Sequence, residues 1–383
     1  MMITPYTTQE HENLRMKVRD FAEKEIKPIA QQLDRDAIFP LDLVKKMGKA
    51  GFFGQFLPKT YGGQGLDYLS LVLTVEELAR IDGSQAATVA SHNSLGIGPI
   101  YYFGTETQKM QWLPQLVTGD HLWAFALTEE NAGSDSRGTQ THAELKDGQW
   151  TINGNKIFIT NSSSPMMLGA TVQAVTGEKD GKKELSTIII GADRKGFHRE
   201  KITGKMMWRS ADTGKMNFDN VKVPEENLLG ERGKGSHMML ETLDSGRLTI
   251  GAMGLGLAQG AFELAMDYAH KREQFGRAIA KFQAISFKLA DMATKIELAR
   301  NTLYNAVWLK DHGKPFAKEA AMAKLYCSEV AKEVADEAVQ IHGAYGLVND
   351  MDIERFYRDQ RILQIGEGTS EILRLVIGRH IGV

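Results

Sequence analysis

The stretch Leu127-Thr128-Glu129-Glu130-Asn131-Ala132-Gly133-Ser134-Asp135 is the most informative part of this chain for its fold. It follows a short apolar strand that is expected at residues 123–127. Further along, Lys156-Ile157-Phe158-Ile159-Thr160-Asn161 is typical of a second strand that also ends in a hydroxyl. The two strand ends would present Thr128, Ser134 and Thr160 as hydrogen-bond partners to one polar heterocycle. Taken alone, the first stretch is more typical of an ordinary Thr/Ser/Gly turn, so a functional interpretation depends on the rest of the chain.

The composition is that of an ordinary globular protein with room for two or three domains in 383 residues. Lys and Arg number 46 against 48 Asp and Glu, so nucleic-acid binding has no compositional support. No apolar run approaches about 18 residues, which argues against a membrane span, and residues 1–11 lack the apolar core of a signal peptide. The single cysteine, Cys327, fits a reducing compartment, so we expect a cytoplasmic protein.

The first third of the chain, residues 8–120, is expected to be helical. Thr8 can cap the first helix, and Pro28 is expected to kink or shorten it. Residues 69–81 form another helix, which Asp82-Gly83 ends.

The middle of the chain, about residues 121–232, has the pattern of strands, with a hairpin expected at Asn153-Gly154 and a turn at Asp180-Gly181. Helical periodicity then returns in two long apolar stripes, at residues 285–307 and 323–341, which indicate an antiparallel helix bundle. Helices, then strands, then helices make an α+β organisation.

Three other patterns argue against competing chemistries. The histidines and the single cysteine have no metal-site spacing, so no metal is expected. The glycine-rich residues 251–260 half-match a dinucleotide fingerprint but follow no clear strand. We therefore interpret them as a helix whose glycines allow another helix or a ligand to approach closely. Cys327 lies on an apolar helical stripe and is interpreted as a core residue rather than a nucleophile.

Near the C-terminus, Gln364-Ile365-Gly366-Glu367-Gly368-Thr369-Ser370-Glu371 places a carboxylate between two glycines, where the backbone can approach a ligand closely. Seen alone, this segment is a helix entry capped by Thr369 or Ser370. Together with the two strand ends, in this order, it resembles the acyl-CoA dehydrogenase family over essentially the whole chain.

Three further segments agree with that resemblance. Asp244-Ser245-Gly246-Arg247 resembles the helix start that holds acyl-CoA. Arg272-Glu273-Gln274-Phe275-Gly276 with Gln283 resembles the segment that reaches the FAD of a neighbouring subunit, and Gln340-Ile341-His342-Gly343-Ala344 resembles a loop at the diphosphate and adenine of FAD.

The resemblance implies an N-terminal helical domain (1–120), a middle β-barrel or sandwich domain (121–232) and a C-terminal four-helix bundle (233–383). It implies FAD-dependent α,β-dehydrogenation of an acyl-CoA, in which Glu367 removes the α-proton and the β-hydride goes to flavin N5. Thr160 would bond to N5, Thr128 to the pyrimidine end of the ring, and Ser134 to the CoA arm. The partners implied are an electron-transferring flavoprotein and three further subunits in a homotetramer, a dimer of dimers.

The resemblance assigns FAD contacts to Phe125, Leu127, Thr128, Gly133, Ser134, Phe158, Ile159, Thr160, Arg272, Phe275, Gln283, Gln340, Ile341, Gly343, Ala344, Thr369 and Glu371. It assigns acyl-CoA contacts to Ser134, Asp244, Arg247, Gly366, Glu367 and Gly368.

The chain departs from the family pattern in three segments. Glu130 stands where proline is common, Phe158 stands where many members have tryptophan, and Met207-Trp208 replace a glycine and a smaller residue. The sequence gives no role for Met207 or Trp208.

The substrate prediction depends on Gly366, because straight-chain members often carry a tyrosine there as one wall of the acyl pocket. Glycine would leave room for a cyclic or branched acyl group. Some members place the base elsewhere, but here Gly246 occupies that alternative position, which favours Glu367. No arginine occurs in residues 82–95, which counts against a dicarboxylic substrate, and Ser91-His92-Asn93 either line the acyl end or pack a helix.

Three alternatives remain open at this stage. The first is a short straight-chain, butyryl-type dehydrogenase. The second is a flavin monooxygenase or oxidase of the same fold, which would not need Glu367. The third is a non-enzymatic scaffold that has lost FAD.

Overall fold

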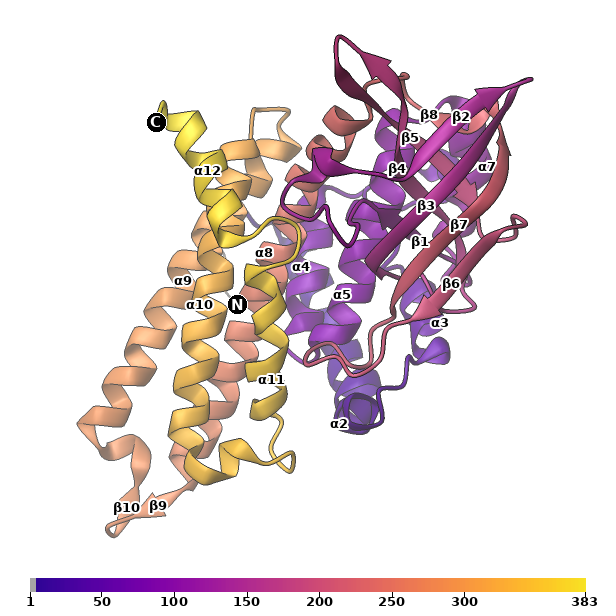
Figure 1. Cartoon of the computed structure of the whole chain (residues 1–383). Coiled ribbons are helices and arrows are strands. Elements are labelled where there is room, and N and C mark those ends of the chain that lie inside the picture. Colours follow the sequence, from indigo (N-terminus) through magenta and orange to yellow (C-terminus); the bar gives the residue numbers. More distant parts are fainter. Residues whose placement is uncertain (1–4) are drawn as a thin grey trace.

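The computed structural model describes residues 5–383, and its first third is a layer of helices (Figure 1). These are α1 (Gln9–Phe21), a π-helical turn (Ala22–Ile26), α2 (Lys27–Asp36), α3 (Leu41–Lys49), α4 (Tyr68–Ala79), α5 (Gly83–Ser91), a second π-helical segment (His92–Ile97), α6 (Gly98–Phe103) and α7 (Glu106–Leu116).

The cap expected at Thr8 is confirmed, and two other helix signals act differently from the expectation. Thr8 caps α1 by accepting a hydrogen bond from the backbone N–H of His11. Pro28 lies in the first turn of α2, directly after the π-helical turn, so it begins a helix rather than bending one. Asp82 does not end α4; its side chain caps the start of α5 by accepting from the N–H of Gln85.

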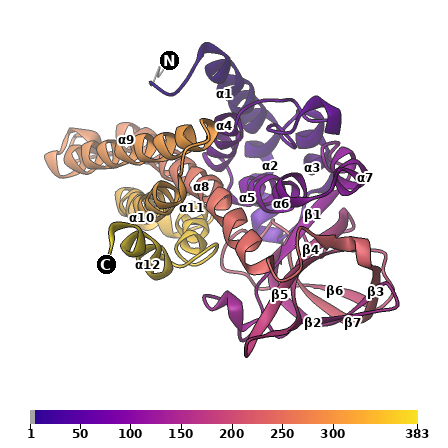
Figure 2. The same cartoon turned by 90° about the horizontal axis from the view of Figure 1, so that it is seen from above.

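The middle of the chain forms one mixed, strongly curved sheet that lies beside the helices (Figure 2). Its path runs β6-β7-β3-β2-β4-β5-β8, with β1 parallel to β4. The curve encloses an apolar core that includes Trp150, Ile152, Val172 and Phe218. The strands are β1 (Leu122–Ala126), β2 (His142–Lys146), β3 (Gln149–Thr160), β4 (Met167–Lys179), β5 (Lys182–Gly191), β6 (Phe197–Lys201), β7 (Thr213–Pro224) and β8 (Leu228–Leu229).

The predicted hairpin at Asn153-Gly154 is wrong. Both residues lie inside β3, where the register with β7 shifts between Ile152 and Gly154. A Cβ on Gly154 would lie 2.6 Å from the Cα of Thr141. Glycine therefore allows the backbone of Thr141 to approach β3 closely at this bulge. The hairpin turn is instead Asp147-Gly148, where both residues have positive φ (52° and 72°). The predicted turn at Asp180-Gly181 is confirmed between β4 and β5.

The last third is helical again, as expected. The long helices α8, α9 and α10 lie side by side, and the short α12 packs on α10 (Figure 1). The bounds are α8 (Gly235–Lys271), β9 (Glu273–Gln274), β10 (Arg277–Ala278), α9 (Gln283–Asp311), α10 (Ala317–His342), α11 (Ile353–Asp359) and α12 (Ser370–Ile381).

The glycine-rich segment is part of α8, as predicted, and allows α4 to approach closely. Added Cβ atoms at Gly256 and Gly260 would lie 2.2 and 2.1 Å from the carbonyl oxygens of Glu76 and Arg80. Helix α8 is long and apolar enough to cross a membrane by length and composition, which the apolar-run argument missed. Because 78% of that apolar window is buried inside the protein, α8 is the central core helix. Cys327 is fully buried on the facing surface of α10, as expected.

Candidate active site

A cavity of about 490 Å³ lies where the middle sheet meets the C-terminal helices. The loop before α12 and the loop after β1 both line it. Figure 1 shows the course of these two loops. Helix α5 closes the cavity with Ala87, Ala90 and Ser91, and α8 with Arg247 and Ile250. The predicted site residues that line it are Phe125, Leu127, Thr128, Gly133, Ser134, Phe158, Ile159, Thr160, Arg247, Gly366, Glu367, Gly368 and Thr369. The structure therefore brings the C-terminal segment that contains Glu367 together with the two strand ends, which lie more than 200 residues earlier in the sequence.

Glu367 has the most unusual environment in this cavity. Its backbone is left-handed, with φ of 53°, although it carries a side chain, and Gly368 follows with φ of 101°. The carboxylate atom Oε2 is buried and has no hydrogen-bond partner among residues 5–383. Burial raises the pKa of this carboxyl to about 7, against the lowering effects of Lys324 and then Arg247. A carboxylate with this pKa and a free oxygen is suited to proton abstraction at neutral pH.

Gly246 lies directly beneath that carboxylate. A Cβ at this position would lie 2.2 Å from Oε2 of Glu367, so a side chain at residue 246 and a glutamate at 367 would compete for one space.

Arg247 is buried one residue further along α8 and forms an ion pair with Asp244. Burial lowers the pKa of its guanidinium, and its Nε has no partner within the described part of the chain. Asp244 itself does not line the cavity. The expectation that residues 244–247 start a helix is wrong, because α8 begins at Gly235.

The two strand ends present free hydroxyls. Across residues 5–383, no protein hydrogen bond uses the side-chain oxygen of Thr128, Ser134 or Thr160. The register of β3 with β7 shifts between Lys156 and Ile159, and Phe158 there has φ of 59° and is 65% exposed. A flat ring system could therefore stack on Phe158 and bond to these hydroxyls, which fits the flavin that the sequence predicts.

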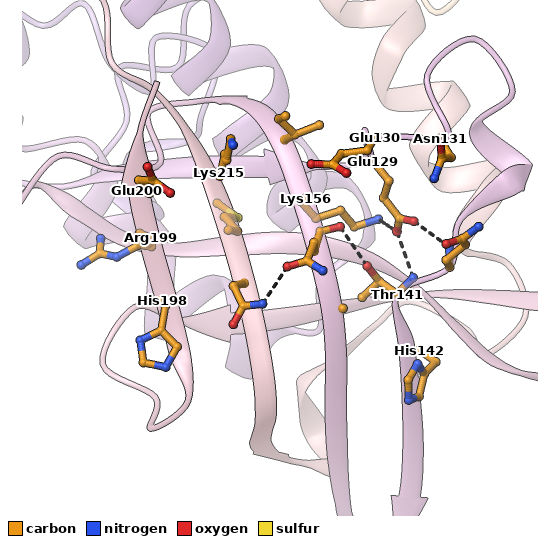
Figure 3. A pocket seen from close by; sticks show the side chains of 16 residues that line it. Glu129, Glu130, Asn131, Thr141, His142, Lys156, His198, Arg199, Glu200 and Lys215 are labelled. Atoms are coloured by element: carbon orange, nitrogen blue, oxygen red, sulfur yellow. Dashed lines mark hydrogen bonds and ion pairs between the residues drawn. The ribbon is translucent and has the colours of Figure 1, made fainter. Parts of the chain in front are cut away.

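A buried ion pair ties the two strand ends together (Figure 3). Lys156 Nζ lies 2.8 Å from Glu129 Oε1 and donates to the carbonyl of Leu127 at 3.0 Å. The Glu129 carboxylate also accepts hydrogen bonds from the N–H groups of Gln140 and Thr141. Burial lowers the pKa of Lys156 to about 8, and the charge of Glu129 opposes that shift. The pair connects the loop that carries Thr128 to the strand that carries Thr160.

The ion pair also forms part of the wall of a larger hollow, of about 620 Å³, which residues of β2, β3, β6 and β7 line. Figure 3 shows the side chains that line it. His142, His198, Arg199, Glu200 and Lys215 give this hollow mixed charge. Among the predicted site residues, none belongs to its lining. The smaller cavity is the better candidate, because it contains the unpaired carboxylate.

The predicted residues of the C-terminal segments lie elsewhere. Arg272, Phe275 and Gln283 are exposed near β9 and β10, at the far end of the bundle from the cavity (Figure 1). Phe275 is 93% exposed and has φ of 52°. Ile341 is packed in the core, so only its backbone could meet a ligand. The remaining predicted residues outside the cavity are Gln340, Gly343, Ala344 and Glu371, all exposed.

Of the three polar residues at the end of α5, only Ser91 lines the cavity. His92 is buried; its ring bonds to the carbonyl of Leu116 and accepts from the N–H of Trp123, and burial lowers its pKa to about 4. The Asn93 side chain bonds to the backbone of Gly54, Phe52 and Val89. His92 and Asn93 therefore pack the helix and do not line the acyl end.

Trp208, for which no role was predicted, lines the cavity. Its φ is 46°, and its backbone N–H donates to Asp359 at 2.8 Å. Met207 packs against the main core.

Lys324 and Lys156 are the residues that the sequence interpretation missed. Lys324 is fully buried on α10 and donates to the carbonyl of Gly368 at 2.6 Å. The signal was a lysine on the apolar stripe that includes Ala320, Cys327 and Ala331, where burial of an unpaired charge is rare. Lys156 was part of a quoted strand but received no role. The structure has no group of three His, Cys, Asp or Glu that could hold a metal within residues 5–383.

Three family models match successive parts of the chain. They are described as acyl-CoA dehydrogenase, N-terminal domain (residues 8–120), middle domain (124–221) and C-terminal domain (233–382).

Two proteins of similar sequence cover almost the whole chain. A probable acyl-CoA dehydrogenase of Bacillus subtilis (strain 168) is 46% identical over 375 residues, which are 98% of this chain and 98% of that protein. A subunit of the caffeyl-CoA reductase–Etf complex of Acetobacterium woodii is 42% identical over 373 residues, which are 97% of this chain and 98% of that protein.

Two solved structures are also similar. Butyryl-CoA dehydrogenase from Megasphaera elsdenii has a TM-score of 0.95 and 41% identity, with 100% of both chains covered. An acyl-CoA dehydrogenase from Bacillus anthracis, complexed with FAD, has a TM-score of 0.92 and 35% identity, with 99% of this chain and 68% of that chain covered.

Proposed function

The chain belongs to the acyl-CoA dehydrogenase family, and on that premise we propose that it dehydrogenates an acyl-CoA thioester between Cα and Cβ with Glu367 as the base. The observation that carries this proposal is the unpaired, buried Oε2 of Glu367 in the cavity.

The α-C–H of a thioester is a weak acid, so the base needs an environment that makes proton removal possible. Burial makes Glu367 more basic than a carboxylate in water. The backbone N–H of Glu367 is proposed to donate to the thioester oxygen, where negative charge develops as the α-proton leaves. One such donor contributes about 3–4 kcal/mol to the stabilisation of an oxyanion.

The cofactor is FAD, which supplies the acceptor for the β-hydride when it is bound. Thr160 and Thr128 are proposed to hydrogen-bond to the flavin ring, with Phe158 shielding one face, and Ser134 to contact the CoA arm. The free hydroxyls and the exposed ring support these roles. Arg272, Phe275 and Gln283 are proposed to reach the FAD of a neighbouring subunit, since they lie far from this cavity.

The proposed assembly is a homotetramer, a dimer of dimers, and the proposed electron acceptor is an electron-transferring flavoprotein. The name of the Acetobacterium relative, a subunit of a reductase–Etf complex, supports that acceptor. The proposed compartment is the cytoplasm, which the single buried cysteine fits.

The proposed substrate has a ring or a branch close to the thioester. Gly366 lines the cavity and contributes no side chain to the wall beside the base, while Ala87 and Ala90 on α5 contribute only small ones. The alternative is a short straight-chain substrate, which the similarity to a butyryl-CoA dehydrogenase favours. The caffeyl-CoA reductase relative, by its name, acts on an aryl-substituted acyl-CoA, so bulky substrates do occur among similar proteins.

The test is anaerobic mixing of the purified holoenzyme with a panel of acyl-CoAs, while the flavin absorbance band is followed. Bleaching would support dehydrogenation, and the relative rates of cyclohexanecarbonyl-, isobutyryl- and butyryl-CoA would rank the substrates. Fast reoxidation of the bleached enzyme by air would instead favour an oxidase or monooxygenase. A colourless protein would favour a scaffold that has lost FAD.

A further inference from the structure

The buried lysine on α10 has an unusual environment. The Lys324 side chain is fully covered, and Nζ donates one hydrogen bond of 2.6 Å, to the carbonyl oxygen of Gly368. Over residues 5–383, no carboxylate oxygen lies within 4.0 Å of this ammonium. An ammonium has three N–H donors, and removing it from water costs several kcal/mol unless it is well paired. The fold therefore bears an electrostatic cost at Lys324, which bonds to the residue that follows the proposed base.

Lys324 acts on Glu367 without touching it. The positive charges of Lys324, on α10, and of Arg247, on α8, both favour the ionised carboxylate of Glu367. Neither forms an ion pair with it, and Oε2 has no partner. A direct ion pair would occupy the oxygen that must reach the substrate. A cation at longer range stabilises the charge and leaves the oxygen free.

The same lysine holds the backbone that aims the base. Glu367 has φ of 53° and Gly368 has φ of 101°, so the turn that they form is strained at a residue with a side chain. Such a conformation is energetically unfavourable and persists only where its surroundings fix it. The hydrogen bond from Lys324 to Gly368 is a tertiary contact that fixes this turn.

We propose that Lys324 is a positioning residue of the dehydrogenation. Its hydrogen bond to Gly368 fixes the turn that carries Glu367, and its charge keeps that carboxylate available as the base. The proposal rests on the proposed function of Glu367 and adds a residue that acts through it.

Other charged groups near the base come from each element packed around it. Arg247 on α8 is already paired with Asp244. On α4, burial and then neighbouring charges, Glu367 among them, raise the pKa of Tyr68, and the charge of Glu371 on α12 acts on Lys324. Among these groups, Lys324 has the largest lowering effect on the pKa of Glu367. It is also the one that bonds to the turn.

Lys324→Gln separates the two roles, because an amide can still donate to Gly368 but carries no charge. The measurement is the pH dependence, from pH 6 to 9, of anaerobic flavin bleaching by the best acyl-CoA of the panel. We expect the inflection due to Glu367 to move up by about one pH unit, with about a tenfold slower rate at pH 7 that recovers at pH 9. Lys324→Met, which loses both the charge and the hydrogen bond, should stay slow at every pH. Lys324→Arg should restore the inflection.

Lys295→Met is the control, since Lys295 is an exposed lysine on α9 paired with Glu333. FAD content and thermal unfolding are measured for every variant. An unshifted inflection in Lys324→Gln would overturn the proposal, and if Lys324→Met does not fold, the Gln and Arg variants decide. Wild-type bleaching by Glu367→Gln would instead overturn the proposed function itself. An inactive Glu367→Gln with an unshifted Lys324→Gln would overturn only the role of Lys324.

Discussion

Two glutamates, the buried Glu76 and the half-buried Glu367, show opposite uses of a carboxylate in one protein. Glu76, on α4, is 2% exposed and accepts hydrogen bonds from Tyr304 at 2.5 Å, Arg15 at 3.3 Å and Arg300 at 3.5 Å. Burial alone would raise the pKa of Glu76, but opposing effects, of which the charge of Arg15 is the largest, lower this pKa below the usual range. Glu367 has an unpaired oxygen and a raised pKa.

The difference lies in where hydrogen-bond donors are placed. At Glu76, donors from α1 and α9 neutralise the charge and hold the N-terminal helices to the bundle. At Glu367, the cations stay beyond pairing distance, so the carboxylate keeps its basicity and the fold bears the cost. Stability and reactivity are therefore separated between two regions.

The largest expected effect is on activity at Glu367. Glu367→Gln should reduce flavin bleaching by about 10²–10⁴-fold or more, because the amide keeps the shape but cannot accept the proton. FAD should stay bound. The rate is followed by stopped-flow absorbance, with Glu329→Gln, at an exposed pair with Arg374, as the matched control. Wild-type turnover in the variant would assign the base to another residue.

The complementary change at Glu76 should affect stability and spare chemistry. Glu76→Gln leaves Arg15 and Arg300 without their shared carboxylate, which should cost about 3–5 kcal/mol in the free energy of unfolding. Urea unfolding measures the loss, and bleaching per bound FAD should be unchanged. A slower chemical step in the folded variant would contradict the separation of the two regions.

Lys156 should combine both kinds of effect, because its buried ion pair supports the site. Lys156→Met leaves Glu129 unpaired and frees the loop of Thr128 from the strand of Thr160. A small misplacement of binding groups is costly, so the FAD dissociation constant should rise about ten- to hundredfold. Fluorescence titration of the apoprotein measures this constant. Lys109→Met, at the exposed pair with Glu106, should leave it unchanged.

The two glutamates should also have opposite pH dependence. The pKa of Glu367 is raised from 4.5 to about 7, so its ionisation destabilises the fold as pH rises through that window. Glu367→Gln should then be more stable than the wild type by about 1–3 kcal/mol at pH 8, and by less at pH 5. The pKa of Glu76 is lowered, so its contribution is present above its unfolded value and is lost as pH falls through its folded one. Unfolding of both variants at pH 5 and pH 8 tests the two signs.

The smallest expected effect is a change in substrate ranking at Gly366. Cyclohexanecarbonyl- or branched acyl-CoA should exceed butyryl-CoA in kcat/KM, and Gly366→Tyr should reverse that order by refilling the space. The backbone tolerates a side chain here, since a Cβ would meet only Ile362, at 3.6 Å or more. An unchanged ranking would contradict the pocket argument and leave the dehydrogenase assignment intact.

Much of this protein follows from local sequence. The helix and strand periodicities, the cap at Thr8 and the buried stripe with Cys327 are confirmed, because each depends on neighbours a few residues away. The motif segments also predicted that Thr128, Thr160 and Glu367 would share one cavity, and they do. Their order along the chain was enough to identify the family.

Tertiary structure alone decided what depends on contacts between distant segments. Sheet register, not the Asn-Gly pair, placed the hairpin at Asp147-Gly148, because both pairs suit a turn and only one lies where β2 meets β3. The paired state of His92 and the free hydroxyls of the strand ends depend on which groups lie across the fold. The basicity of Glu367 could likewise not be predicted from local sequence. It results from burial, which raises the pKa, and from the opposing charge of Lys324, 43 residues earlier in the sequence.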